Sequence, residues 1–285
     1  MALIQLNYVS SALFRTVTVN VVLPCDKLDA DRKHYLNRGK KFKTLYLLHG
    51  LIGNYTDWIS GTRVQRLAEK NDLAVVMPSG DNSFYVNSYA IPNNDYGRFI
   101  GEELVEVTRA MFPLSDKRED TFVGGLSMGG FGALRTGLKY SDTFSAIISL
   151  SGALHVFEDE AGHGAKIQDE NWAFGRSIFG PAETAMKSDN NPRVLLDDLQ
   201  ASGKGKESLP KIFMACGTDD FLLPGNRSFS KELKERGLDL TYIEAPGNHN
   251  WFFWDTYIKE ALDWLPLEEK FAGMDSGNIA KKINS

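Results

Sequence analysis

The stretch TFVGGLSMGGFGALR, residues Thr121–Arg135, places five glycines around one serine, Ser127. Glycine weakens strands and helices, and it is used where the backbone must turn sharply or approach another segment closely. The residues before Ser127 are typical of a short apolar strand, and residues 129–140 are typical of a helix. The stretch therefore predicts a tight strand-to-helix turn that holds the Ser127 hydroxyl outward.

Short apolar runs on both sides of this turn predict a parallel sheet, because runs without polar alternation are typical of strands covered on both faces. They alternate with segments whose apolar residues recur every three or four positions, as in helices that bury one stripe. The alternation predicts a doubly wound α/β fold, mostly parallel, with helices on both faces. The predicted strands are 44–48, 73–77, 121–125, 146–150, 211–215 and 240–245, and the predicted helices contain 64–68, 100–111, 133–138, 229–233 and 257–262.

The first strand candidate, Arg15–Leu23, has a different pattern. Its valines alternate with polar residues, which is typical of a half-buried strand. We expect it to be an antiparallel strand at the edge of the sheet. About 285 residues is ordinary for one α/β enzyme domain, so we expect a single domain over 1–285, with a loosely held tail at 272–285.

The alternation lapses in residues 155–210, where acidic, glycine-rich and asparagine-rich sequence takes its place. A structureless loop of that length would be unusual in a compact domain. Segments 171–180 and 191–200 contain enough apolar residues to pack as short helices. We therefore expect an insertion that forms a cap above the sheet.

The composition is that of a globular chain, with 42% hydrophobic and 24% charged residues and a net charge of −5. The sequence has no long Lys/Arg run of the kind that would indicate binding to nucleic acid or to a membrane surface. The N-terminal residues lack the pattern of a secretory signal, so a cytoplasmic location is expected. Cys25 and Cys216 are expected to be free thiols, with Cys216 packed at a strand end.

Gly125-Leu-Ser127-Met-Gly129 matches the nucleophile elbow, a strand–turn–helix corner that exposes a serine hydroxyl above the carboxyl ends of the strands. Glycine is needed at the flanking positions because a Cβ there would collide with a neighbouring strand or helix. The alternative is a glycine-rich turn that binds a phosphate or nothing. The strand and helix expected on either side favour the elbow.

A serine hydroxyl needs a base within hydrogen-bond reach, and the base needs a carboxylate to hold it. In an α/β hydrolase the order along the chain is serine, acid, histidine. His249 follows the last predicted strand and precedes the last predicted helix, where the base of this fold is found. His155 and His163 fall in the insertion and are expected to be solvated loop residues. Their acidic neighbours could suggest a metal site, but no His-x-x-x-His or Cys pair supports one.

The carboxylate should follow the strand before the last. Asp219 and Asp220 both stand just past the strand 211–215, and the residues alone leave both open. An alternative is that both are solvent-exposed residues of a turn and have no catalytic role.

Acyl transfer also needs N–H donors for the oxyanion that develops on the substrate. The backbone N–H of Met128 directly follows the proposed nucleophile. The second donor should come from the loop LLHGLIGN after an early strand, where Leu51 is the candidate. His49 and Gly50 would shape this loop, and no proton transfer is expected of His49.

Four separated motifs together resemble the esterase D branch of the α/β hydrolases, most closely its bacterial tributyrin-esterase-like members. They are YLLHGLIGNYTDWI (46–59), GLSMGGFGALR (125–135), CGTDDFL (216–222) and GNHNWFFWDTYIKEALDWLPL (247–267). The resemblance covers about residues 5–268 and implies the α/β-hydrolase fold. It implies the nucleophile Ser127, the base His249, the acid Asp220 in preference to Asp219, and the oxyanion donors Leu51 and Met128.

The resemblance implies a serine carboxylesterase for short-chain acyl esters of acetyl or butyryl type, with carbohydrate-linked and feruloyl esters in its range. The reaction would pass through an acyl-enzyme without a cofactor or metal. The same branch includes S-formylglutathione hydrolases, but the loop HGLIGN lacks the cysteine that they carry there. A third alternative is a retired hydrolase fold used as a binding module, although no member of the triad is missing. Family members often self-associate, so a homo-oligomer is compatible with the resemblance.

Aromatic residues gather near the predicted mouth of the site, where small-molecule pockets are mostly apolar. Because aromatic residues more often pack in a core, at most half of them are expected to line a pocket. The candidates are Trp58, Phe84, Tyr85, Tyr89, Phe221, Trp251 and Phe252.

Overall fold

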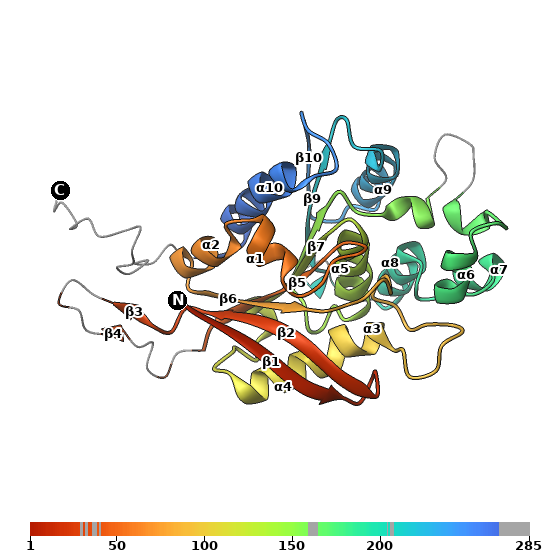
Figure 1. The fold of residues 1–285 in the computed structure, drawn as a ribbon. Coiled ribbons are helices and arrows are strands. Elements are labelled where there is room, and N and C mark those ends of the chain that lie inside the picture. The colour runs from red at the N-terminus through yellow and green to blue at the C-terminus, as the bar shows by residue number, and fades with distance from the viewer. Residues whose placement is uncertain are drawn as a thin grey trace.

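The computed structural model describes residues 1–28, 31, 34–35, 39, 41–158, 165–203, 205 and 208–267 (Figure 1). Within these residues, eight strands form the main sheet in the order β1-β2-β6-β5-β7-β8-β9-β10. A separate short pair consists of β3 (Lys27–Leu28) and β4 (His34–Tyr35). The predicted doubly wound α/β architecture is confirmed. The expected tail, 272–285, lies outside the described residues.

The six predicted parallel strands are all present. Five of them are almost wholly buried, because helices cover both faces of the sheet; only β10, at one edge, is half-buried along most of its length. All their mutual pairings are parallel. These strands are β5 (Lys43–Leu48), β6 (Leu73–Pro78), β7 (Thr121–Leu126), β8 (Ala146–Leu150), β9 (Lys211–Gly217) and β10 (Leu240–Ala245).

The antiparallel strand β2 (Arg15–Leu23) is confirmed, but its predicted place at the edge is wrong. Strand β1 (Ala2–Ser10) pairs with it along its full length, and β6 pairs with it on the other side. The alternation in β1 is blurred because Leu3 and Val9 stand on its exposed side. Hydropathy alone therefore did not identify β1 as a strand.

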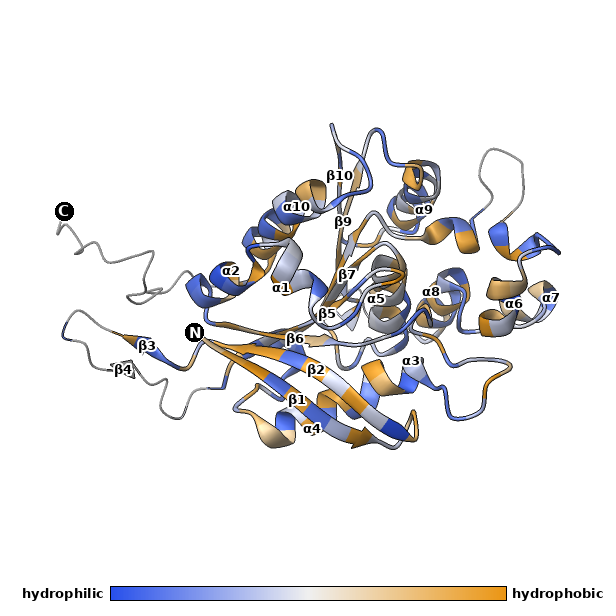
Figure 2. Ribbon diagram, in the orientation of Figure 1, coloured by the Kyte–Doolittle hydropathy of each residue, from blue (hydrophilic) through white to orange (hydrophobic). Residues whose placement is uncertain are grey.

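Helices cover the sheet in two layers, each with its own apolar core (Figures 1 and 2). Helices α1, α2 and α10 contribute to one core, and α3, α4, α5, α8 and α9 contribute to the other. The predicted helices are confirmed. Their bounds are α1 (Asp57–Gly61), α2 (Val64–Lys70), α3 (Tyr96–Arg98), a π-helical turn (Phe99–Glu103), α4 (Leu104–Met111), α5 (Met128–Lys139), α6 (Ala173–Phe179), α7 (Ala182–Met186), α8 (Pro192–Ala201), α9 (Leu223–Glu235) and α10 (Trp251–Trp264).

The insertion contains the two predicted short helices, α6 and α8, and also α7, which the sequence did not indicate. An aromatic cluster attaches it to the rest of the domain. The Phe179 ring in α6 lies 5.2 Å from that of Phe84 and 6.1 Å from that of Phe131, measured between ring centroids. Phe131 lies one turn after Ser127 in α5. The insertion is therefore anchored close to the elbow, while its role as a cap stays a prediction.

Both cysteines are free thiols, as expected. Cys216 is buried near the end of β9, and burial raises the pKa of its thiol to about 12. In the described part of the chain, no helix has both the length and the apolar character needed to cross a bilayer.

Replacing Phe179 with alanine should lower the free energy of unfolding by about 3–4 kcal/mol, because a fully buried aromatic side chain is lost and leaves a cavity. Phe174→Ala in the same helix is the control. Phe174 is 41% exposed, so its loss should cost about 1 kcal/mol or less. Urea unfolding measures both values, and equal losses would contradict anchoring through Phe179.

Candidate active site

The corner between β7 and α5 holds Ser127 in a conformation that non-glycine residues rarely adopt, with φ at +54°. Ser127 N–H donates to the Leu150 carbonyl at 2.9 Å, which ties the corner to β8. A Cβ added at Gly125 would lie 2.3 Å from the Gly129 oxygen, and one added at Gly129 would lie 2.4 Å from the Leu48 oxygen. Both elbow positions therefore require glycine for the reason that the sequence indicated.

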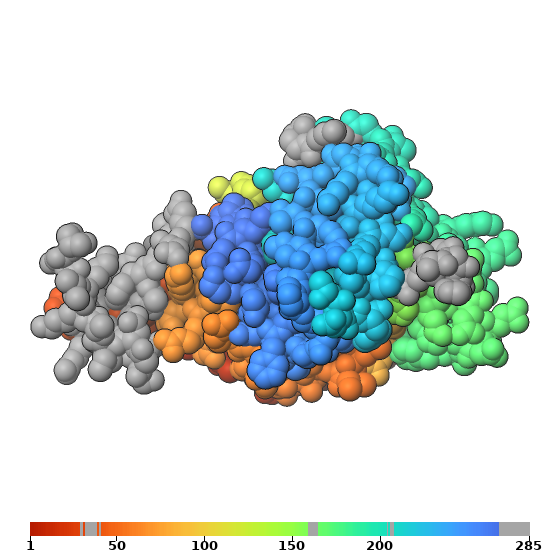
Figure 3. Space-filling view, turned by 90° about the horizontal axis from the view of Figure 1, so that it is seen from above, coloured from red at the N-terminus to blue at the C-terminus, as the bar shows by residue number. Residues whose placement is uncertain are grey.

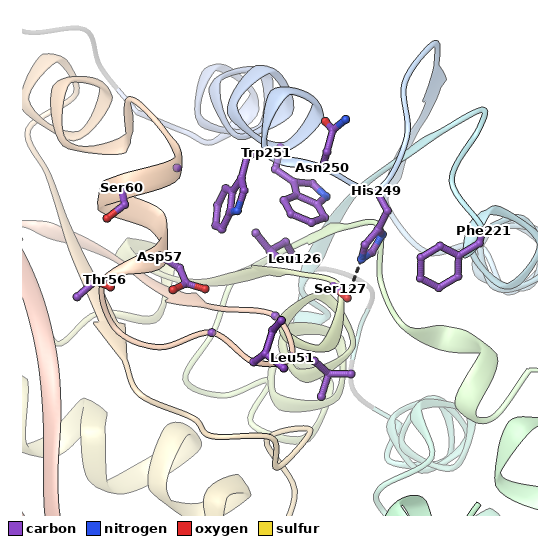
Figure 4. Close-up of a pocket in the computed structure, with 15 residues that line it drawn as sticks. Leu51, Thr56, Asp57, Ser60, Leu126, Ser127, Phe221, His249, Asn250 and Trp251 are labelled. Atoms are coloured by element: carbon purple, nitrogen blue, oxygen red, sulfur yellow. Dashed lines mark hydrogen bonds between the residues drawn. The ribbon is translucent and has the colours of Figure 1, made fainter.

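The structure brings Ser127, His249 and Asp220 together (Figure 4). His249 Nε2 lies 3.0 Å from Ser127 Oγ, and its Nδ1 lies 2.9 Å from Asp220 Oδ2. An ionised carboxylate has no proton to donate and can only accept hydrogen bonds, so Nδ1 carries the proton and Nε2 is free to accept from the serine hydroxyl. This arrangement can take a proton from Ser127 and give it to another group.

Asp220 and Asp219 have different environments although they are neighbours. Asp220 is 4% exposed and also accepts the Leu222 N–H at 2.9 Å. Burial acts to raise the pKa of Asp220, but the hydrogen bonds from His249 and Leu222 N–H outweigh it and leave the pKa below its usual value. Asp219 is exposed, and its backbone N–H donates to the Gly247 oxygen. The carboxylate at His249 is therefore that of Asp220.

The loops that carry Asp220 and His249 follow the adjacent parallel strands β9 and β10, at the same edge of the sheet. Gly217 of β9 is paired with Ala245 of β10. The Thr218 N–H then donates to the Ala245 oxygen at 2.9 Å. A Cβ at Gly217 would lie 2.3 Å from the Gly247 oxygen, so the two loops are in direct backbone contact. The sheet thus sets the distance between Asp220 and His249.

The loop after β5 lies against the elbow. A Cβ at Gly50 would lie 3.5 Å from Ser127 Cβ, and the next residue, Leu51, lines the same cavity as Ser127. Met128 is the first residue of α5, so its N–H has no acceptor within the helix. The two expected oxyanion donors thus belong to segments that flank Ser127.

A cavity of about 790 Å³ opens beside Ser127. Ser127 and His249 lie at one end, and Asp57 and Ser60 lie at the other, with Trp251 between them (Figure 4). Seen from above, the blue segment that contains α10 lies between the orange segment of α1 and α2 and the green segment of α6 and α7 (Figure 3). The cavity is lined by Gly50, Leu51, Ile52, Gly53, Thr56, Asp57, Ser60, Gly61, Leu126, Ser127, Phe221, His249, Asn250, Trp251 and Trp254.

Of the seven aromatic candidates, Phe221 and Trp251 line this cavity, in agreement with the expectation that at most half would. Trp254 also lines the cavity and was not among the candidates, although its place three residues after Trp251 on a helix could have indicated it. The others lie in the core or outside the cavity: Trp58, Phe84 and Tyr85 are buried, whereas Tyr89 and Phe252 are exposed.

His155 is not the solvated loop residue that the sequence suggested. Its side chain is partly buried, and its Nδ1, which is shielded from solvent, has no hydrogen-bond partner among the described residues. Burial and the nearby charges of Lys166 and His249 lower the pKa of His155 to about 4. His163 lies outside the described residues. Within the described residues, no cluster of His, Cys, Asp and Glu could hold a metal ion.

A serine, a histidine and a carboxylate in line at the carboxyl edge of such a sheet are characteristic of α/β hydrolases that act through a serine. The class of protein is therefore an α/β-hydrolase-fold serine hydrolase. The chain belongs to the esterase family, because the family model described as putative esterase matches residues 10–265.

Individual relatives agree with this family. The chain is 42% identical to an acetyl esterase from Caldicellulosiruptor saccharolyticus over 93% of this chain and 98% of that protein. Among solved structures, it is similar to the fluorophosphonate-binding serine hydrolase FphF of Staphylococcus aureus, with a TM-score of 0.79 and 32% identity. It is also similar to the S-formylglutathione hydrolase FrmB of Staphylococcus aureus, with a TM-score of 0.77 and 32% identity. Each alignment covers 93% of this chain and 98% of the solved chain.

His155→Leu should make the protein less sensitive to acid. The pKa of His155 is about 4 in the folded state and about 6.5 in the unfolded state, so only the unfolded state takes up a proton between these values. Stability therefore falls as the pH falls from 6.5 to 4. Urea unfolding at pH 7 and 4.5 should show that the wild type loses about 2 kcal/mol more than the variant. Equal losses would show that His155 titrates normally.

Proposed function

We propose that this esterase is a serine carboxylesterase that hydrolyses short-chain acyl esters, of acetyl or butyryl type, with Ser127, His249 and Asp220 as its catalytic triad. The observation that carries the proposal is the continuous hydrogen-bonded line through the three side chains. His249 joins the other two at 3.0 Å and 2.9 Å. Both distances are within hydrogen-bond reach, as required for a base beside its nucleophile and for the carboxylate that orients the base.

In the first half of the reaction, Ser127 Oγ attacks the carbonyl carbon of the ester and its proton passes to His249 Nε2. Asp220 stabilises the imidazolium that forms. The N–H groups of Leu51 and Met128 donate to the oxyanion of the tetrahedral intermediate. The intermediate then collapses, the bond to the alcohol oxygen breaks, and the alcohol leaves with the proton from Nε2.

In the second half, a water molecule gives a proton to His249 Nε2 and its oxygen attacks the acyl-enzyme carbonyl. A second tetrahedral intermediate forms, held by the same two N–H groups. The bond to Ser127 Oγ breaks, the serine regains its proton from Nε2, and the carboxylic acid leaves. Every proton is accounted for by the chain, the ester and one water.

The acyl preference is supported by the acetyl esterase relative at 42% identity. The cavity is larger than an acetyl group requires, at about 790 Å³. Its apolar middle, formed by Leu126 and Trp251, and its polar end, at Asp57 and Ser60, leave room for a larger group. Carbohydrate-linked and feruloyl esters therefore stay within the proposed range.

The second candidate function is hydrolysis of the thioester S-formylglutathione, and the similarity to FrmB favours it. Two features oppose it. The loop after β5 lacks the cysteine expected of such enzymes. Asp57 also places a carboxylate in the cavity, and like charges disfavour a leaving group that carries carboxylates of its own.

Removing members of the triad should abolish catalysis without unfolding the protein. Ser127→Ala should lower kcat on nitrophenyl butyrate by a factor of about 10⁴ or more, and Asp220→Asn by about 10³ to 10⁴. Asp219→Asn is the matched control, because this exposed side chain does not contact His249, and it should stay within about twofold of wild type. A comparable loss for the two aspartate variants would contradict the assignment.

A direct comparison of substrates separates the two candidate functions. We expect kcat/KM for nitrophenyl acetate to exceed that for S-formylglutathione by a factor of about 100, since the site favours uncharged leaving groups. Both reactions can be followed by absorbance on one enzyme preparation, with Ser127→Ala as the blank. A preference for the thioester would favour the second function and would not contradict the assignment of the triad.

A further inference from the structure

The oxyanion donor Leu51 depends on the orientation of a single peptide group. Its N–H belongs to the same planar unit as the Gly50 carbonyl. Because none of the peptide bonds in the described chain is cis, the two groups point in opposite directions. Whatever holds the Gly50 oxygen therefore aims the Leu51 N–H, and this dependence rests on the proposed function.

The Gly50 oxygen is held by His49 and by the Gly53 N–H, which donates to it at 3.3 Å. His49 Nδ1 lies 2.7 Å from that oxygen, and His49 Nε2 accepts the Gly80 N–H at 2.8 Å. Since Nε2 is an acceptor, the proton must be on Nδ1, which donates to Gly50. The ring is 1% exposed, and burial lowers the pKa of His49, which favours this neutral form. The imidazole thus links the loop after β6 to the peptide of Leu51.

The next peptide group is held from the same loop. The Ile52 N–H donates to Asn82 Oδ1 at 2.7 Å. This bond crosses from the loop after β5 to the loop after β6, thirty residues further along the chain. The Tyr85 hydroxyl adds a third link by donating to the His49 oxygen at 2.9 Å.

Ile52 has a backbone conformation that it would not adopt unaided. Its φ is +60°, which is an outlier for a β-branched residue and costs about 1–3 kcal/mol. Its side chain is 94% exposed, so apolar packing does not offset this cost. Two hydrogen bonds hold the Ile52 backbone in place: its own N–H donates to Asn82, and the Gly53 N–H closes the turn around it by donating to the Gly50 oxygen at 3.3 Å.

We propose that Asn82 and His49 are positioning residues for the oxyanion hole. They fix the two peptide groups on either side of Leu51 and so aim its N–H at the carbonyl oxygen of the substrate. Neither side chain contacts the substrate. The loop from Ser79 to Tyr85 supports both, because Asn82 belongs to it and its Gly80 N–H donates to His49.

Asn82 gives the sharper test, because its exposed side chain can be changed with little effect on folding, whereas His49 is buried. The probes are nitrophenyl acetate and its thiono analogue, in which sulfur replaces the carbonyl oxygen. Sulfur accepts hydrogen bonds weakly, so donors in an oxyanion hole accelerate the oxygen ester far more than the thiono ester. Single-turnover acylation with enzyme in excess measures both.

Asn82→Ala should lower the acylation rate of the oxygen ester by about tenfold or more, with KM changed less than about twofold. The thiono ester should change less than about twofold, so the ratio of the two rates should fall about tenfold. Asn82→Asp keeps the acceptor oxygen and should restore the ratio to within about threefold of wild type. Asn94→Ala, in the same connection between β6 and α3, is the control and should leave the ratio unchanged.

A fall of both esters by the same factor would indicate a general structural effect and would overturn the proposal, as would an unchanged ratio. Failure of the proposed function has a different signature, since wild type and Ser127→Ala would then be equally inactive on the oxygen ester. If Asn82→Ala is too unstable to purify, Ile52→Pro, which removes the N–H and excludes positive φ, gives the same expected fall in ratio.

Discussion

The structure depends on one close approach between backbones, at the point where β7 passes into α5. Gly125 and Gly129 leave no room there for a Cβ, and the end of β5 lies directly against Gly129. Because three segments meet without intervening side chains, small displacements of one are transmitted to the others. The positive φ of Ser127 is the local strain that this contact imposes.

Much of this arrangement could be predicted from local sequence. The parallel strands were recognisable because strands covered on both faces are apolar at every position, as in β6 and β8. The elbow was recognisable because a strand–turn–helix corner of this kind needs residues without a Cβ on either side of the serine, and this requirement does not depend on the rest of the fold. The residues alone could not separate Asp219 from Asp220, since their difference in burial arises only when the loops after β9 and β10 meet.

Other features depend on contacts between distant segments. The edge strand β1 was missed because Leu3 and Val9 face outward and blur its alternation. His155 is partly buried because its turn packs against α9 and against residues 166–168, whereas its neighbours in sequence suggested a solvated loop. The link between Asn82 and Ile52 has no local signature, because a hydrogen bond between two loops follows from their placement by the sheet.

The two ends of the cavity belong to different parts of the architecture. Ser127 and His249 are supported by the central sheet, whereas Asp57 and Ser60 belong to α1, a helix of five residues. Helix α1 is secured from below by Trp58, whose ring N–H donates to the Leu48 oxygen at 3.0 Å. The cavity-lining side chains at positions 57 and 60 can therefore change during evolution while Trp58 holds the helix in position. Selectivity can change in this way at constant reactivity, which makes α1 a favourable place to redirect the enzyme toward new esters.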